Sequence, residues 1–120
     1  MKTMKPGAIL LICIFLLQFS YGQNIPKKQT IKVYGNCGQC KNKIEKSAIS
    51  AGAGYASWNK KTKKLNIRYD PSVINPVDIE RAIANAGYDT QDIKASDSAY
   101  NELEKCCQYH RIQSITSKIN

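Results

Sequence analysis

The sequence that decides the fold is IKVYGNCGQC, residues 31–40. Its first half alternates apolar and polar side chains, which is the pattern of a β-strand. Its second half is a Cys-x-x-Cys turn made by Cys37 and Cys40, and an amphipathic helix pattern begins at the second cysteine. Two thiolates on such a turn bind one soft metal ion or close one disulfide. The run predicts a strand–loop–helix unit with metal or redox chemistry.

The residues that follow continue in a pattern of alternating elements. Ile44 and Ala48 lie four and eight residues after Cys40, and Gly52 and Gly54 end this helix. Next come a hairpin of strands 55–58 and 64–69, a helix that begins at the Asn75 N-cap with Pro76 and ends at Gly87, and a strand at 90–95.

This order predicts an α+β fold of the ferredoxin-like βαββαβ type, with a four-stranded antiparallel sheet and two helices on one face. We expect this domain to cover residues 30–95 and a C-terminal extension to cover residues 96–120. The extension begins with a short helix capped by Ser96 or Asp97, and the polar tail from His110 is expected to fray. One side of this helix carries Tyr100, Leu103 and Cys107.

The N-terminal residues 1–22 have the pattern of a signal peptide, with basic residues before an apolar run and small residues before the predicted cleavage after Gly22. The apolar run is shorter than the roughly 20 residues of a membrane-spanning helix, which disfavours the alternative of a stable membrane anchor. Cys13 would leave with the signal peptide. Residues 23–29 are predicted to be a linker, and the mature protein is expected to be periplasmic or secreted.

The chain has a net charge of +9. Nucleic-acid binding is disfavoured, because the protein is expected to be exported and no aromatic-rich binding motif accompanies the charge. The charge indicates either an ordinary solvated surface or steering toward an acidic partner or an anionic membrane.

Four cysteines remain after cleavage, as the pairs Cys37/Cys40 and Cys106/Cys107. A disulfide within either pair would close a very small loop and gain little stability. Such local pairs suit metal binding or redox chemistry better than structural crosslinking.

At this point the chain resembles the heavy-metal-associated domains of copper chaperones, copper-ATPase modules and periplasmic mercury-binding proteins. Cys37-Gly38-Gln39-Cys40 stands at the metal-binding motif of this family, and Ile44-Glu45 at its apolar–Glu pair. The sequence departs from the family at Gly35-Asn36, where Met-Thr is usual, and this departure predicts a more mobile loop. The second half matches at Tyr69-Asp70-Pro71, Ile79, Ile83 and Ala86-Gly87-Tyr88.

The resemblance implies that Cys37 and Cys40 bind a soft metal ion, most readily Cu(I), and that Tyr88 shields the site. It also implies a partner such as a metal-transporting ATPase or another metal-binding protein with an acidic docking face. We expect a monomer in the apo form, and no catalytic activity, because the chain offers no nucleophile–base pair and no convergent carboxylates.

The extension adds Cys106, Cys107 and His110 as candidate further ligands, which either join the first site or form a separate one. The alternative is that Cys107 packs in the core and His110 is an ordinary surface residue. Four thiolates, or three with an imidazole, would also suit Zn(II).

The leading hypothesis is an exported Cu(I) carrier or sequestering protein. A mercury or zinc binder of the same fold is the first alternative, with Hg(II) or Zn(II) as the ion. A thiol–disulfide oxidoreductase is the second alternative, and the absence of a thioredoxin-like element order argues against it.

Overall fold

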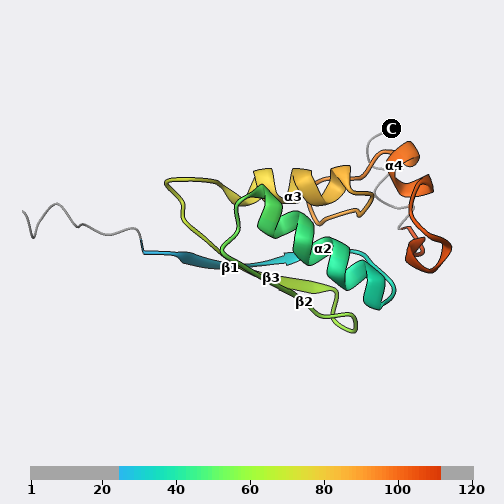
Figure 1. Ribbon diagram of the computed structural model, residues 1–120, viewed down its shortest axis with the longest axis horizontal. Helices are drawn as coiled ribbons and strands as arrows, with labels where there is room; N and C mark the ends of the chain where they lie inside the picture. The colour runs from blue at the N-terminus through green and yellow to red at the C-terminus, as the bar shows by residue number, and fades with distance from the viewer. Residues whose placement is uncertain (1–24, 112–120) are drawn as a thin grey trace, which may run out of the picture.

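The structure is a computed structural model that describes residues 25–111 of the chain. The predicted signal peptide and the tail beyond Arg111 lie outside the described residues. Within the described part, three strands and two longer helices are followed by two short helical segments (Figure 1). No helix in residues 25–111 is long and apolar enough to cross a membrane.

The sheet consists of β1 (Lys27–Lys32), β2 (Tyr55–Trp58) and β3 (Lys64–Tyr69), which pair antiparallel with β3 in the middle. Side chains of β3 alternate between exposed and buried, as the sequence pattern predicts. Leu65 pairs with Ile31 on one side and with Trp58 on the other, so the three strands place apolar residues in one layer. Strand β1 begins at Lys27, three residues before the predicted start of the domain at residue 30, so residues 27–29 lie in the sheet rather than in a linker.

Helices α2 (Gly38–Ala51) and α3 (Pro76–Asn85) pack against each other on one face of the sheet (Figure 1). The buried residues of α2 are Cys40, Ile44 and Ala48, which confirms the predicted spacing of four. The predicted cap of α3 is confirmed too, because the Asn75 side chain accepts a hydrogen bond from the backbone N–H of Asp78 at 3.2 Å.

The prediction of a fourth strand at 90–95 is wrong for the described chain. Thr90 forms only an isolated antiparallel bridge with Val33. Its backbone N–H then bonds to the carbonyl of Ile93 at 2.8 Å, and its hydroxyl donates to buried Glu80 at 2.7 Å. These bonds turn the chain away from the sheet after one residue, so local hydrogen bonding overrides the strand pattern.

The C-terminal helix also differs from the prediction of one helix reaching Cys107. The helix α4 (Asp97–Asn101) begins at the predicted Ser96 cap and is five residues long, and the separate 3₁₀ turn η1 (Lys105–Cys107) follows. Between them Leu103 is buried and its side chain lies directly over Gly87. Burial of Leu103 against the domain therefore redirects the chain before the helix can extend.

The loop that precedes the first cysteine of the motif packs tightly at Gly35. A Cβ atom at this position would lie 3.0 Å from Ile44 Cδ1 and from two ring atoms of Trp58. The ring is itself held in place, because Trp58 Nε1 donates to the carbonyl of Val33 at 2.9 Å. The Gly35 carbonyl accepts from Lys63 Nζ at 2.6 Å. These contacts tie down the loop at the position where the family usually has methionine.

We expect Gly35→Ala to destabilise the fold by about 1–3 kcal/mol, because the added methyl group overpacks a site whose neighbours are held. Urea unfolding would measure the loss. Gly38→Ala is the matched control, since a Cβ there has no neighbour within 4 Å and the residue lies in α2. Equal stabilities for the two variants would contradict this packing.

Candidate metal site

The two cysteines of the motif lie where the β1–α2 loop becomes a helix. Cys37 is the N-cap residue of α2 and has extended backbone dihedral angles, and Cys40 lies in the first turn. Their sulfurs are 3.4 Å apart. Cys37 is partly buried and Cys40 is completely buried. The positive end of the helix dipole therefore lies at a pair of adjacent thiols.

The two C-terminal cysteines join this pair from a distant part of the chain. The Cys37 sulfur lies 3.2 Å from that of Cys106 and 3.5 Å from that of Cys107. The Cys106 and Cys107 sulfurs are 3.9 Å apart. The sulfurs of Cys37, Cys40 and Cys107 all lie within 4.8 Å of one another, as a group that could hold a metal ion. We call Cys37, Cys40, Cys106 and Cys107 the sulfur cluster.

Burial divides the cluster into an inner and an outer part. Cys40 and Cys107 have no exposed surface, whereas Cys106 is exposed. The Cys106 thiol also donates to Gln39 Oε1 at 3.1 Å, and its carbonyl accepts from Asn36 Nδ2 at 3.3 Å. The loop and the extension are thus joined at the surface by Gln39 of the motif and by Asn36, which precedes it.

His110, the remaining candidate ligand, is exposed and does not belong to the group of potential ligands found among residues 25–111. His110 follows Cys106 by four residues, which would place both on one face of a continuous helix, but η1 ends at Cys107. The structure therefore brings the cysteines together and leaves His110 outside their cluster.

Tyr88, the predicted shield, is completely buried. Its ring stacks on that of Tyr109, with centroids 6.0 Å apart and planes inclined by 20°. Its hydroxyl is the one buried side-chain oxygen or nitrogen in the described chain that has no hydrogen-bond partner. Burial raises the pKa of this hydroxyl, and the nearby thiols of Cys107 and Cys40 raise it further. Tyr88 therefore contributes an unsatisfied donor on the inner side of the cluster, and its shielding role stays a prediction.

A clamp that sequence reasoning missed holds the extension against the domain. Arg111 donates from Nε to Asp89 Oδ2 at 3.0 Å and from one terminal nitrogen to Oδ1 at 2.8 Å. The other terminal nitrogen bonds to Asp97 at 2.8 Å. Tyr109 adds a second tie, because its hydroxyl donates to the carbonyl of Gly87 at 2.9 Å and accepts from the N–H of Asp89 at 2.7 Å.

These ties contradict the expected fraying of the chain from His110, at least as far as Arg111. The one signal in the sequence was Arg111 itself, because most basic residues of the chain are lysines. An arginine guanidinium, unlike a lysine amine, makes a planar two-point contact with a carboxylate. We call residues 97–111 the strap.

The environment of Cys37 favours its thiolate. Burial raises its pKa, but the backbone N–H of Cys40 and the thiols of Cys106, Cys40 and Cys107 stabilise the anion and lower the pKa to about 6. Burial has the opposite outcome at Cys107, whose pKa is raised. The pKa of Cys106 is raised as well, chiefly by its contact with Cys37. At neutral pH, an anionic Cys37 sulfur therefore lies beside the neutral thiols of Cys106 and Cys107.

We expect the alkylation rate of Cys37 in the reduced apo protein to rise with a midpoint near pH 6, because the thiolate is the reacting form. Iodoacetamide labelling followed by peptide mass spectrometry at pH 5 to 9 would measure it. Buried Cys107 serves as the internal control and should label far more slowly. A Cys37 midpoint near the ordinary value of 9.0 would contradict the assigned contacts.

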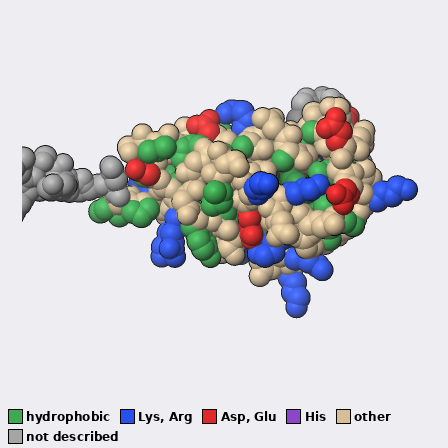
Figure 2. All heavy atoms as spheres, in the orientation of Figure 1, with side chains coloured by type: hydrophobic (Ala, Val, Ile, Leu, Met, Phe, Trp, Pro, Cys, Tyr) green, Lys and Arg blue, Asp and Glu red, His purple; other side chains and the backbone are tan. Residues whose placement is uncertain are grey.

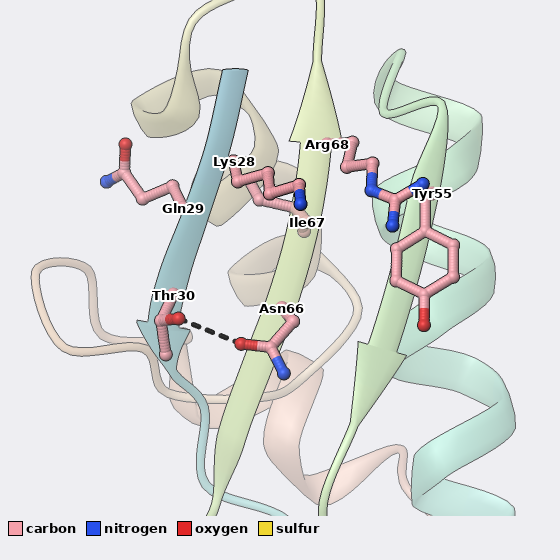
Figure 3. A pocket seen from close by; sticks show the side chains of 7 residues that line it. All are labelled: Lys28, Gln29, Thr30, Tyr55, Asn66, Ile67 and Arg68. Carbon is pink, nitrogen blue, oxygen red and sulfur yellow. Dashed lines mark hydrogen bonds between the residues drawn. The ribbon is translucent and has the colours of Figure 1, made fainter. Parts of the chain in front are cut away.

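A hollow elsewhere on the molecule has a different character. It lies on the open face of the sheet, away from the helices, where Thr30 donates to Asn66 at 2.8 Å and the Arg68 guanidinium lies over the Tyr55 ring (Figure 3). No cysteine, histidine or carboxylate lines it. Among the described residues, the potential soft-metal ligands therefore lie together at the sulfur cluster and not in this hollow.

Comparison with known proteins gives matches to a heavy-metal-associated domain and to copper proteins. Residues 31–89 match the family model of the heavy-metal-associated domain. Copper-transporting ATPase 1 of Rattus norvegicus is 38% identical over 69 residues, and its Mus musculus counterpart is 36% identical over 69 residues. Each match covers 57% of this chain but only 5% of the ATPase.

Solved structures of small proteins match over nearly their whole length. A Bacillus anthracis protein assigned copper-ion binding is 31% identical with a TM-score of 0.53, and the match covers 57% of this chain and 100% of that one. The CopZ metallochaperone is 27% identical with a TM-score of 0.51, over 53% of this chain and 98% of that one. The fold, the position of the Cys-x-x-Cys loop and these matches agree, and the chain belongs to the heavy-metal-associated domain family.

Proposed function

We propose that this protein is an exported Cu(I)-binding protein that carries or sequesters the ion through Cys37 and Cys40. The observation that carries the proposal is the pair of sulfurs 3.4 Å apart at the N-terminus of α2. Soft thiolates select Cu(I) over hard ions, and the helix N-terminus offsets their negative charge. The copper-related similar proteins support this choice of ion.

The role is to bind the ion, and to carry or sequester it, rather than to catalyse a reaction. The partner class is a metal-transporting ATPase or another metal-binding protein with an acidic docking face. Lys and Arg side chains project from many places on the face shown in Figure 2. Near the site, however, Lys41 is paired with Glu45 and donates to the carbonyl of Trp58 at 2.9 Å. Lys43 and Lys46, farther along α2, and Lys105, next to Cys106, can contribute to long-range steering.

Anaerobic titration of the reduced mature protein with Cu(I), against a chromogenic Cu(I) chelator, tests the proposal. We expect tight binding of one ion per monomer. Failure of the wild-type protein to compete with the chelator would overturn the proposed function. Export is tested separately, by expressing the full chain and fractionating cells, with processing near Gly22 as the expected result.

Zn(II) and Hg(II) are the alternative ions. One observation favours Zn(II): four sulfurs lie together, as in tetrahedral zinc–thiolate sites. Competition among the three ions in the same titration decides between them. The same thiols would serve a thiol–disulfide oxidoreductase, whose signature would be disulfide exchange activity without metal affinity.

A further inference from the structure

The sulfur cluster lies where the Cys-x-x-Cys loop meets the C-terminal extension, and it adds two cysteines to the pair of the motif. Cys107 is as deeply buried as Cys40, and both lie beside the Cys37 sulfur. A buried thiol in van der Waals contact with the motif is placed to ligate whatever ion the motif binds. We propose that Cys107 is the third thiolate of a closed, intramolecular Cu(I) site, and that the strap holds it there. This inference rests on the proposed function.

The spacing of the sulfurs fits three ligands. A metal ion with bonds of about 2.3 Å to sulfur holds three or four thiolates about 3.8–4.0 Å apart, and two opposite thiolates about 4.6 Å apart. The Cys37 sulfur lies 3.4 Å from Cys40 and 3.5 Å from Cys107. The Cys40 and Cys107 sulfurs lie within 4.8 Å of each other. Small shifts therefore let the three sulfurs surround one ion, whereas a linear pair requires the Cys37 and Cys40 sulfurs to move farther apart.

The unsatisfied hydroxyl of Tyr88 is an independent observation that points to the same site. A buried donor without a partner costs free energy. Tyr88 has no partner among the described residues, although the Cys40 and Cys107 thiols are its neighbours. A thiolate that binds a metal ion is a stronger hydrogen-bond acceptor than a thiol. The ion would thus supply the hydroxyl with the acceptor that it lacks.

The strap explains how Cys107 stays in place. Arg111 and Tyr109 tie the segment after Cys107 to Asp89 and Gly87, and Leu103 packs over Gly87 before it. Cys107 is thereby fixed on both sides. An intramolecular thiolate occupies the position that a partner's thiolate would otherwise take, so handing over the ion requires Cys107 to leave. The closed site favours sequestration over rapid transfer.

The test uses X-ray absorption spectroscopy on the reduced mature protein with one equivalent of Cu(I) under anaerobic conditions. We expect three sulfur ligands in the wild type and two in Cys107→Ala. Cys106→Ser tests the rival ligand, because Cys106 lies 3.2 Å from Cys37 but outside the group of three sulfurs within 4.8 Å of one another, and three sulfurs should remain. His110→Ala is the matched control, since His110 is exposed and lies outside the sulfur cluster. Native mass spectrometry of the same samples should show one ion in one monomer.

Affinity and exchange provide a second readout. Even residues that only support metal ligands contribute about 10- to 100-fold to affinity, so loss of Cys107 should weaken Cu(I) binding by at least about tenfold. It should also speed removal of the ion by a chelator. Circular dichroism and urea unfolding show whether each variant is folded, and the sulfur count of the wild type holds independently of any variant.

Two sulfurs in the wild type would overturn the inference and leave the proposed function standing, since the ion would still be bound by the motif. A count that falls in Cys106→Ser but not in Cys107→Ala would also overturn it, as would sulfurs shared between two chains in a dimer.

Discussion

Cys37→Ser is expected to abolish tight Cu(I) binding. The Cys37 sulfur is the one that lies within 3.5 Å of each of the other three sulfurs of the cluster. Its substitution removes the common neighbour of both cysteine pairs, and a serine hydroxyl is a poor ligand for a soft ion. The loss should exceed about 100-fold, the upper end of what supporting residues contribute. Titration against a Cu(I) chelator measures it.

His110→Ala is the control for this substitution. The residue is exposed and outside the sulfur cluster, so affinity should be unchanged. A large loss in His110→Ala would show that the sequence-based hypothesis of an imidazole ligand is right. Wild-type affinity in Cys37→Ser would remove Cys37 from the metal site altogether.

Arg111→Ala is expected to lower the free energy of unfolding by about 3–5 kcal/mol, as removal of one partner of a buried ion pair does. The Asp89 side chain is 4% exposed and that of Arg111 is 13% exposed. The variant leaves the Asp89 carboxylate buried without its two-point partner, and the strap loses its bond to Asp97 as well. Urea unfolding of the apo protein measures the effect.

Arg81→Ala is the matched control. Its ion pair with Asp78 is exposed on both sides, with side-chain exposures of 58% and 47%, and should contribute less than about 1 kcal/mol. Similar losses of stability in the two arginine variants would contradict the role of Arg111 in holding the strap against the domain. Thiol labelling adds a local readout, because Cys107 should become reactive in Arg111→Ala before the domain unfolds.

The local elements were predictable because each has its own signal in nearby residues. The spacing of Ile44 and Ala48 marks α2, the Asn75 cap marks the start of α3, and alternation marks β3. The fourth strand was not predictable in the same way. The bond from the Thr90 hydroxyl to buried Glu80 depends on where α3 packs, and that bond turns the chain.

In the candidate site, too, one part was predictable from local sequence and the other depended on the tertiary structure. The Cys-x-x-Cys spacing by itself determined that Cys37 and Cys40 meet at a helix N-terminus, because three residues span less than one helical turn. Only the tertiary structure decided that Cys106 and Cys107 join them and that His110 does not. Those contacts cross about 70 residues and depend on the burial of Leu103 and the pairing of Arg111 with Asp89. No local periodicity records such pairings, since their free energy comes from surfaces that meet only once the domain has folded.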